Sequence, residues 1–150
     1  MKKILTILSL FISVNFYSQI IHPLDGTNIK QLNCGQTVPY YDPGGSQGDY
    51  DPYVMSEQQF IVPSGGHVIQ IDFNNLFDVK SNAGGGCEDY IEVYDGATGG
   101  APLIGLYCNI NPPGIITSTG NAILVKFISD GANNHQGWMA TVTAVDILNP

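Results

Sequence analysis

The sequence of 150 residues is poor in basic side chains and contains no arginine. Its 5 lysines face 13 acidic residues, which gives a net charge of −8 at pH 7. Two of these lysines, Lys2 and Lys3, lie within the first 18 residues, and the rest of the chain is therefore more acidic still. Nucleic acids and anionic lipid surfaces bind proteins mainly through lysine and arginine. We therefore expect neither as a partner, whereas cations and basic proteins remain compatible with this charge.

Long apolar runs are also missing after the first residues. Lys2 and Lys3 precede an apolar run over residues 4–16 and the small residue Ser18, a pattern typical of a secretory signal peptide. The run is shorter than the roughly 20 residues that a bilayer span needs. We expect a signal peptide over residues 1–18, a leader segment over 19–33, one domain over 34–146 and a tail over 147–150. The prediction is a secreted, extracellular chain with no membrane insertion.

No window of a dozen residues beyond the leader has helical spacing with caps, and glycine and proline interrupt residues 35–52. Short runs rich in β-branched and aromatic residues, separated by turn clusters, predict strands instead. The expected strands are residues 59–62, 67–73, 89–94, 103–107, 122–128 and 138–145. This pattern predicts an all-β fold, an antiparallel sandwich or barrel.

Catalytic signatures such as H-E-x-x-H, a phosphate-binding loop or paired C-x-x-C motifs do not occur. We interpret the three histidines, His22, His67 and His135, as surface or turn residues, and we do not expect an enzyme. Trp138 is predicted to lie in the core. The tyrosines of the glycine-rich segment suit either carbohydrate stacking or local packing, and packing is favoured; they are Tyr40, Tyr41, Tyr50 and Tyr53.

The sequence contains only three cysteines, which is an odd number. Cys87 and Cys108 bracket a strand, a glycine-rich loop and a second strand, so a disulfide across this hairpin is expected. Closing a loop of that length stabilises a fold by on the order of 3 kcal/mol. Cys34 is then left as an extra thiol outside that bond, either buried or available for intermolecular pairing.

Two segments resemble the CUB domain family, and in particular single-domain secreted members from bacteria with a spermadhesin-like jelly roll. They are C-E-D-Y-I-E-V-Y-D-G at residues 87–96 and F-I-S-D-G followed by G-W-x-A at residues 127–140. The segment Y-Y-D-P-G-G-S-Q-G-D-Y at residues 40–50 is similar to a motif of the bacterial members. The resemblance implies an antiparallel jelly-roll β-sandwich that recognises extracellular protein or carbohydrate without catalysis.

Many members of this family bind Ca²⁺, and the resemblance implies where the ligands would lie. The matching positions are Asp89, Asp130, Ala132 through its carbonyl, and Asn133. The expected glutamate aligns instead with Lys80, whose ammonium would weaken such a site severely. Asp78 is the alternative source of that carboxylate. A calcium site is therefore not favoured, and a second hypothesis is that Lys80 itself serves as a built-in cation between Asp89 and Asp130. A third is that Asp89 and Asp130 are turn and strand-end residues whose side chains accept hydrogen bonds from backbone N–H groups.

The leading functional hypothesis is a binding module that presents the loops around residues 80–89, 95–102 and 130–137 to a protein or glycan. The alternative is a structural or assembly protein joined through Cys34 or through sheet edges. The oligomeric state and the ligand are not predicted.

Overall fold

A computed structural model describes residues 18–63 and 65–148, and these residues form ten β-strands and no helix. No helix that could span a membrane occurs in this part of the chain. The strands are β1 (Ile20–Ile21), β2 (Asp25–Gln31), β3 (Thr37–Tyr41), β4 (Met55–Ile61), β5 (His67–Asp78), β6 (Tyr90–Tyr94), β7 (Leu103–Tyr107), β8 (Ile115–Thr117), β9 (Ala122–Ile128) and β10 (Gly137–Asp146).

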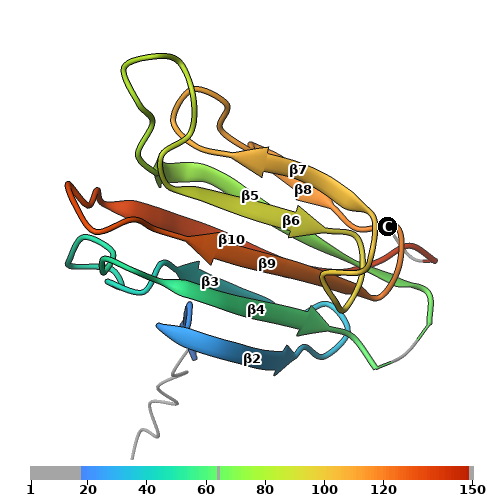
Figure 1. The fold of residues 1–150 in the computed structure, drawn as a ribbon. Coiled ribbons are helices and arrows are strands. Elements are labelled where there is room, and N and C mark those ends of the chain that lie inside the picture. The colour runs from blue at the N-terminus through green and yellow to red at the C-terminus, as the bar shows by residue number, and fades with distance from the viewer. Residues whose placement is uncertain (1–17, 64, 149–150) are drawn as a thin grey trace, which may run out of the picture.

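The strands form two five-stranded sheets that pack face to face as a β-sandwich (Figure 1). One sheet has the order β1-β3-β10-β5-β8 and the other the order β2-β4-β9-β6-β7. All neighbours are antiparallel except β1 with β3 and β2 with β4, which are parallel pairs at the same edge of the sandwich. The predicted all-β sandwich of the jelly-roll class is confirmed, with these two parallel pairs as an addition.

Alternation of buried and exposed side chains places the core between the sheets. In β9, Ile123, Val125 and Phe127 face the core, and in β10 the buried Trp138 does the same. This period of two follows from the pleat, which points successive side chains to opposite faces. The six predicted strands are all present, and β4, β5 and β10 are longer than their patterns indicated.

The segment assigned as a leader, residues 19–33, is part of the sandwich. β1 joins one sheet and β2 joins the other, while Ile20 and Leu32 lie buried in the core. The folded domain therefore begins at Ile20 rather than at Cys34. Of the predicted signal peptide, residues 1–17 lie outside the described part of the chain. The predicted tail is described only to Leu148, and the Ile147 amide donates to the Gly66 carbonyl at 3.0 Å.

Two aromatic interpretations are corrected by the packing. Tyr40 and Tyr50 are fully buried in the main core rather than packed locally within a loop, because Tyr40 belongs to the strand β3. His22 is also a core residue: it is 1 % exposed, and its Nδ1 lies 2.6 Å from the Tyr40 hydroxyl. Its ring packs against Trp138, with centroids 5.5 Å apart. The short β1 is what carries His22 into the core.

Candidate functional site

Three loops meet at one end of the sandwich, on the left in Figure 1: residues 42–54, 79–89 and 129–136. They precede β4, β6 and β10 respectively. The loop at residues 95–102 follows β6 and so lies at the opposite end, where Asp95 accepts hydrogen bonds from the amide and hydroxyl of Thr119. The expectation that this loop would join the other two in one surface was therefore wrong.

Asp89 holds the three loops together from a fully buried position. Its Oδ2 accepts a hydrogen bond of 2.5 Å from the Tyr50 hydroxyl, and its Oδ1 accepts one of 2.7 Å from the Asp130 amide. The Asp89 amide in turn donates to the Lys80 carbonyl at 3.1 Å. A buried carboxylate is tolerated only when its oxygens are bonded in this way. Both oxygens of Asp89 are therefore already engaged within the protein.

Lys80 places its ammonium group among oxygens from two of these loops. Nζ lies 3.0 Å from Glu88 Oε1, 3.7 Å from Asp130 Oδ2 and 2.8 Å from the Ala132 carbonyl, to which it donates a hydrogen bond. The Lys80 residue is only 7 % exposed, whereas the side chains of Glu88 and Asp130 are 37 % and 40 % exposed. The buried cation thus lies beneath two carboxylates that reach the surface.

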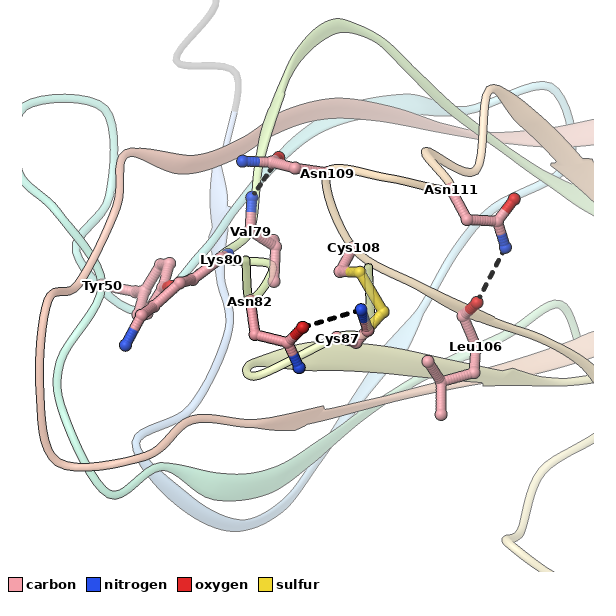
Figure 2. Close-up of a disulfide and its surroundings, with 10 residues drawn as sticks. Tyr50, Val79, Lys80, Asn82, Cys87, Leu106, Cys108, Asn109 and Asn111 are labelled. Atoms are coloured by element: carbon pink, nitrogen blue, oxygen red, sulfur yellow. Dashed lines mark hydrogen bonds between the residues drawn. A yellow bond between two sulfur atoms is a disulfide. The ribbon is translucent and has the colours of Figure 1, made fainter. Parts of the chain in front are cut away.

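The disulfide Cys87–Cys108 fixes the base of the loop that carries Lys80, as Figure 2 shows. Cys87 also forms an isolated β-bridge with Ser81, and the amide of Val79 donates to Asn109 Oδ1 at 2.9 Å. The main chain of Lys80 is held on its other side, because its amide donates to the Tyr50 hydroxyl at 3.3 Å. The predicted disulfide is confirmed, and it restrains the position of Lys80.

Two predicted metal ligands, Asp78 and Asn133, form no hydrogen bond or ion pair with this cluster among the described residues. Asp78 ends β5 and accepts hydrogen bonds from Asn109 Nδ2 at 2.7 Å and from the Gln136 amide at 3.5 Å, with His135 Nδ1 2.8 Å away. Asp78 therefore does not replace the missing carboxylate. Asn133 occupies a left-handed turn with φ of 58°, and no hydrogen bond of its side chain is found among the described residues. Asp89, Asp130 and Ala132 lie close together. The ion pairs of Lys80 are with Asp130 and with Glu88, which the sequence interpretation missed, rather than with Asp89.

The electrostatics of the cluster follow from these contacts. The amide of Ala132 and, more weakly, the charge of Lys80 lower the pKa of Asp130 despite some desolvation. The hydrogen bond with Glu88 raises the pKa of Lys80, so the ammonium stays charged at neutral pH. Burial and the bond to Asp89 raise the pKa of Tyr50, which keeps its hydroxyl a donor.

The residues do not fit a calcium ion at this place. Calcium takes six to eight oxygen ligands, whereas here Asp89 spends both oxygens on protein donors and Asp130 Oδ1 accepts from the Ala132 amide at 2.9 Å. The remaining oxygens face the ammonium of Lys80. Within residues 18–63 and 65–148, no three acidic, histidine or cysteine side chains are grouped as metal ligands.

One exposed aromatic next to the cluster was undervalued by the sequence interpretation. Tyr53 is 79 % exposed and adopts a φ of 58°, which is unusual for a bulky residue. Its amide donates to the Asp130 carbonyl at 2.9 Å, and its ring lies directly over Gly131, where a Cβ would meet the Tyr53 hydroxyl at 2.1 Å. Strained residues persist where the surroundings hold them, often at functional sites.

A G-x-S-x-G nucleophile motif was expected to be absent, but Gly44, Ser46 and Gly48 match its letters. That motif acts on a sharp strand-to-helix turn, whereas this segment connects the strands β3 and β4. The polar contact found for Ser46 Oγ within the described residues is with Gln47 Nε2 at 3.5 Å. Within residues 18–63 and 65–148, Ser46 thus has no hydrogen-bonded base of the kind that activates a nucleophile.

Comparison with known proteins identifies the family. The sequence pattern that defines the CUB domain matches residues 48–142. The chain belongs to the CUB domain family. A cubilin from Canis lupus familiaris is 33 % identical over 132 residues, which are 87 % of this chain and 4 % of that protein. Neuropilin-1 from Xenopus laevis is 33 % identical over 103 residues, which are 65 % of this chain and 11 % of that protein.

These CUB relatives are therefore far longer than the present chain, which spans only a small fraction of each. Solved CUB structures share the fold. The CUB1-EGF-CUB2 region of human MASP-1/3 superposes with a TM-score of 0.65 at 20 % identity, over 78 % of this chain and 41 % of that one. The MASP-1 CUB2 domain bound to Ca²⁺ gives a TM-score of 0.60 at 20 % identity, over 73 % and 95 %. At these identities the likeness concerns the fold alone.

Proposed function

We propose that this CUB domain is a secreted, non-catalytic binding module for an extracellular protein or glycan, and that Lys80 holds its recognition loops in place of a metal ion. The observation that carries the proposal is the position of the Lys80 ammonium, within 3.0 Å of Glu88 and 2.8 Å of the Ala132 carbonyl. Secretion is proposed from the N-terminal charge and apolar run.

The charge arrangement supports a metal-independent role. Without a cation, the carboxylates of Glu88, Asp89 and Asp130 would repel one another across the joined loops. A covalently attached ammonium neutralises part of that charge at every calcium concentration, whereas a bound metal does so only when it is abundant. The exposed ring of Tyr53 beside these loops adds a rigid aromatic surface of the kind that dominates binding interfaces.

Thermal unfolding in calcium and in chelator tests this assignment. We expect the unfolding temperature of the wild-type protein to be the same in both solutions, because the ammonium already occupies the position between the loops. Lys80→Met should lower that temperature by several degrees in both solutions, since it leaves the carboxylates uncompensated. Lys80→Glu supplies the missing carboxylate, so the unfolding temperature of this variant should be higher in calcium than in chelator.

Lys126→Met is the matched control, because Lys126 lies 3.8 Å from Glu92 on the face of a sheet with its side chain 31 % exposed. It should have little effect. A calcium-dependent rise in the wild-type protein that disappears in Asp130→Ala would refute the role given to Lys80. Equal effects of Lys80→Met and Lys126→Met would refute it as well.

A second candidate function, assembly through a thiol, is supported by the exposure of Cys34. Cys34 is an exposed residue, and its Sγ lies 3.9 Å from His67 Nδ1. Non-reducing electrophoresis of wild type and Cys34→Ser separates the two functions. A dimer of the wild type that Cys34→Ser abolishes would favour assembly. A monomer in both wild type and Cys34→Ser would favour the binding module.

A further inference from the structure

Resting on the proposed binding function, we infer that a pocket on the outer face of the β10-containing sheet binds a single uncharged sugar ring. The pocket has a volume of about 210 Å³. It is bordered by the loop between β3 and β4 and lies beside the Lys80 cluster rather than within it. Its lining side chains are Ser46, Gln47, Asp49, Leu76, Gln136 and Met139.

The floor of the pocket is apolar and lies on two central strands of the sheet. Met139 and Leu76 are direct partners across β10 and β5. Along β10, the residues on either side of Met139, Trp138 and Ala140, face the core, so Met139 points outward. Two side chains fixed on central strands give a flat apolar patch of the kind that the C–H face of a pyranose ring can cover.

The first wall is a glycine-rich loop held by a buried carboxylate. Asp42 is fully buried, and its Oδ1 accepts from the Gly44 amide at 2.7 Å while its Oδ2 accepts from the Trp138 amide at 3.1 Å. Gly45 adopts a φ of 71°, which favours glycine. The bare backbone at Gly45 and Gly48 lets a ligand approach the main chain closely, and the loop needs little ordering on binding.

The opposite wall is Gln136, whose main chain is fixed by Asp78. Among the described residues, the side chains of Asp49 and Gln136 form no hydrogen bond with the protein, and that of Gln47 forms only the long one with Ser46. One carboxylate, two amides and a hydroxyl thus offer both donors and acceptors around an apolar floor. Hydroxyl groups of a neutral sugar match this set.

Charge and size narrow the ligand class further. No lysine lines the pocket, and Asp49 contributes a negative charge, so anionic sugars and phosphates are disfavoured. The volume is smaller than the roughly 300 Å³ at which sites for drug-sized ligands begin, which favours one ring over an oligosaccharide. Such a ligand should bind with a dissociation constant of about 1 mM.

Amide chemical-shift mapping of the ¹⁵N-labelled protein tests the proposal, with methyl glycosides of mannose, galactose and glucose as probes and glucuronate as the anionic comparison. We expect shifts confined to residues 45–49, 76, 136 and 139 for at least one neutral glycoside and none for glucuronate. Asp49→Asn should weaken binding because it removes the charge that strengthens hydrogen bonds from the sugar hydroxyls, and Gln136→Ala because it removes an amide contact, each by about tenfold. Asp51→Asn has the same charge change on an exposed residue outside the pocket and should bind as the wild type does.

The absence of shifts with all three glycosides at about 10 mM would overturn the proposal, as would shifts that persist in both pocket variants. An N-acetyl-lysine amide that shifts the pocket residues when no glycoside does would overturn it in favour of a peptide ligand. Failure here would leave the Lys80 proposal intact, because that test measures unfolding temperatures and calcium. Conversely, a refuted role for Lys80 would not move the sugar-induced shifts.

Discussion

Burial of His22 makes the stability of this domain depend on pH in a way that can be calculated. Burial lowers the pKa of His22 from 6.5 to about 3, and the nearby Ser56 backbone offsets this only in part. Because the folded pKa lies below the unfolded one, the unfolded chain binds the proton more readily between these values. Stability is therefore complete above pH 6.5 and is lost as the pH falls toward 3. Between pH 8 and pH 5 the loss is about 2 kcal/mol.

Urea unfolding at pH 8 and pH 5 measures this difference, and His22→Gln isolates it because glutamine does not titrate. The variant is less stable at pH 8, since the ring contact with Trp138 is lost, but its stability should fall by about 2 kcal/mol less on acidification than that of the wild type. Burial raises the pKa of Asp42 to about 6, although hydrogen bonds from the Gly44 and Trp138 amides lower it. This shift increases stability as the pH falls, which is opposite to the effect of His22. Because Asp42 is present in both proteins, its contribution cancels in the comparison. Equal losses in wild type and His22→Gln would refute the reasoning, and His67→Gln serves as the control at a histidine outside the aromatic core.

Three further changes test the packing of the loop end. Gly137→Ala should destabilise the fold by about 3 kcal/mol in urea, because φ is 73° and a Cβ would meet a buried carboxyl carbon at 2.3 Å; Gly99→Ala, which meets nothing within 4 Å, should be neutral. Cys87→Ser should lower the free energy of unfolding by about 3 kcal/mol, and equal stability of the reduced wild type and this variant would confirm that the loss comes from the disulfide. Tyr50→Phe should cost about 2 kcal/mol because it leaves the buried Asp89 one donor short; an unchanged urea midpoint would show that the bond contributes nothing.

The longer runs rich in β-branched or apolar residues were predictable as strands, whereas β2 was missed. Residues 122–128 and 103–107 have the same bounds in the sequence prediction and in the structure, because both runs are rich in β-branched or apolar residues. β2 has almost all of its side chains exposed, so it carries no period, and it is a strand only because its backbone pairs with β4. Such pairing between distant segments leaves no local pattern in the sequence.

The site was predictable in its residues but not in its geometry. The resemblance to CUB domains located Asp89, Asp130 and Lys80, which the structure places in one cluster. It gave no signal for Glu88, because a glutamate beside a disulfide cysteine in a loop is normally a solvated residue. The role of Asp78 depended on register across a glycine-rich insertion, and its contacts with Asn109 and His135 in the structure show which way it faces.

The edge of the sandwich opposite the parallel pairs bears on the behaviour of the protein at high concentration. β7 and β8 end their sheets there, side by side in Figure 1, and they carry the exposed side chains of Leu103, Leu106 and Ile115. Unpaired apolar edges join copies of a protein unless something keeps the copies apart. In this chain that barrier is the net charge of −8, and it vanishes near the isoelectric point of about 4.4. Colloidal stability therefore rests on pH rather than on the shape of the fold.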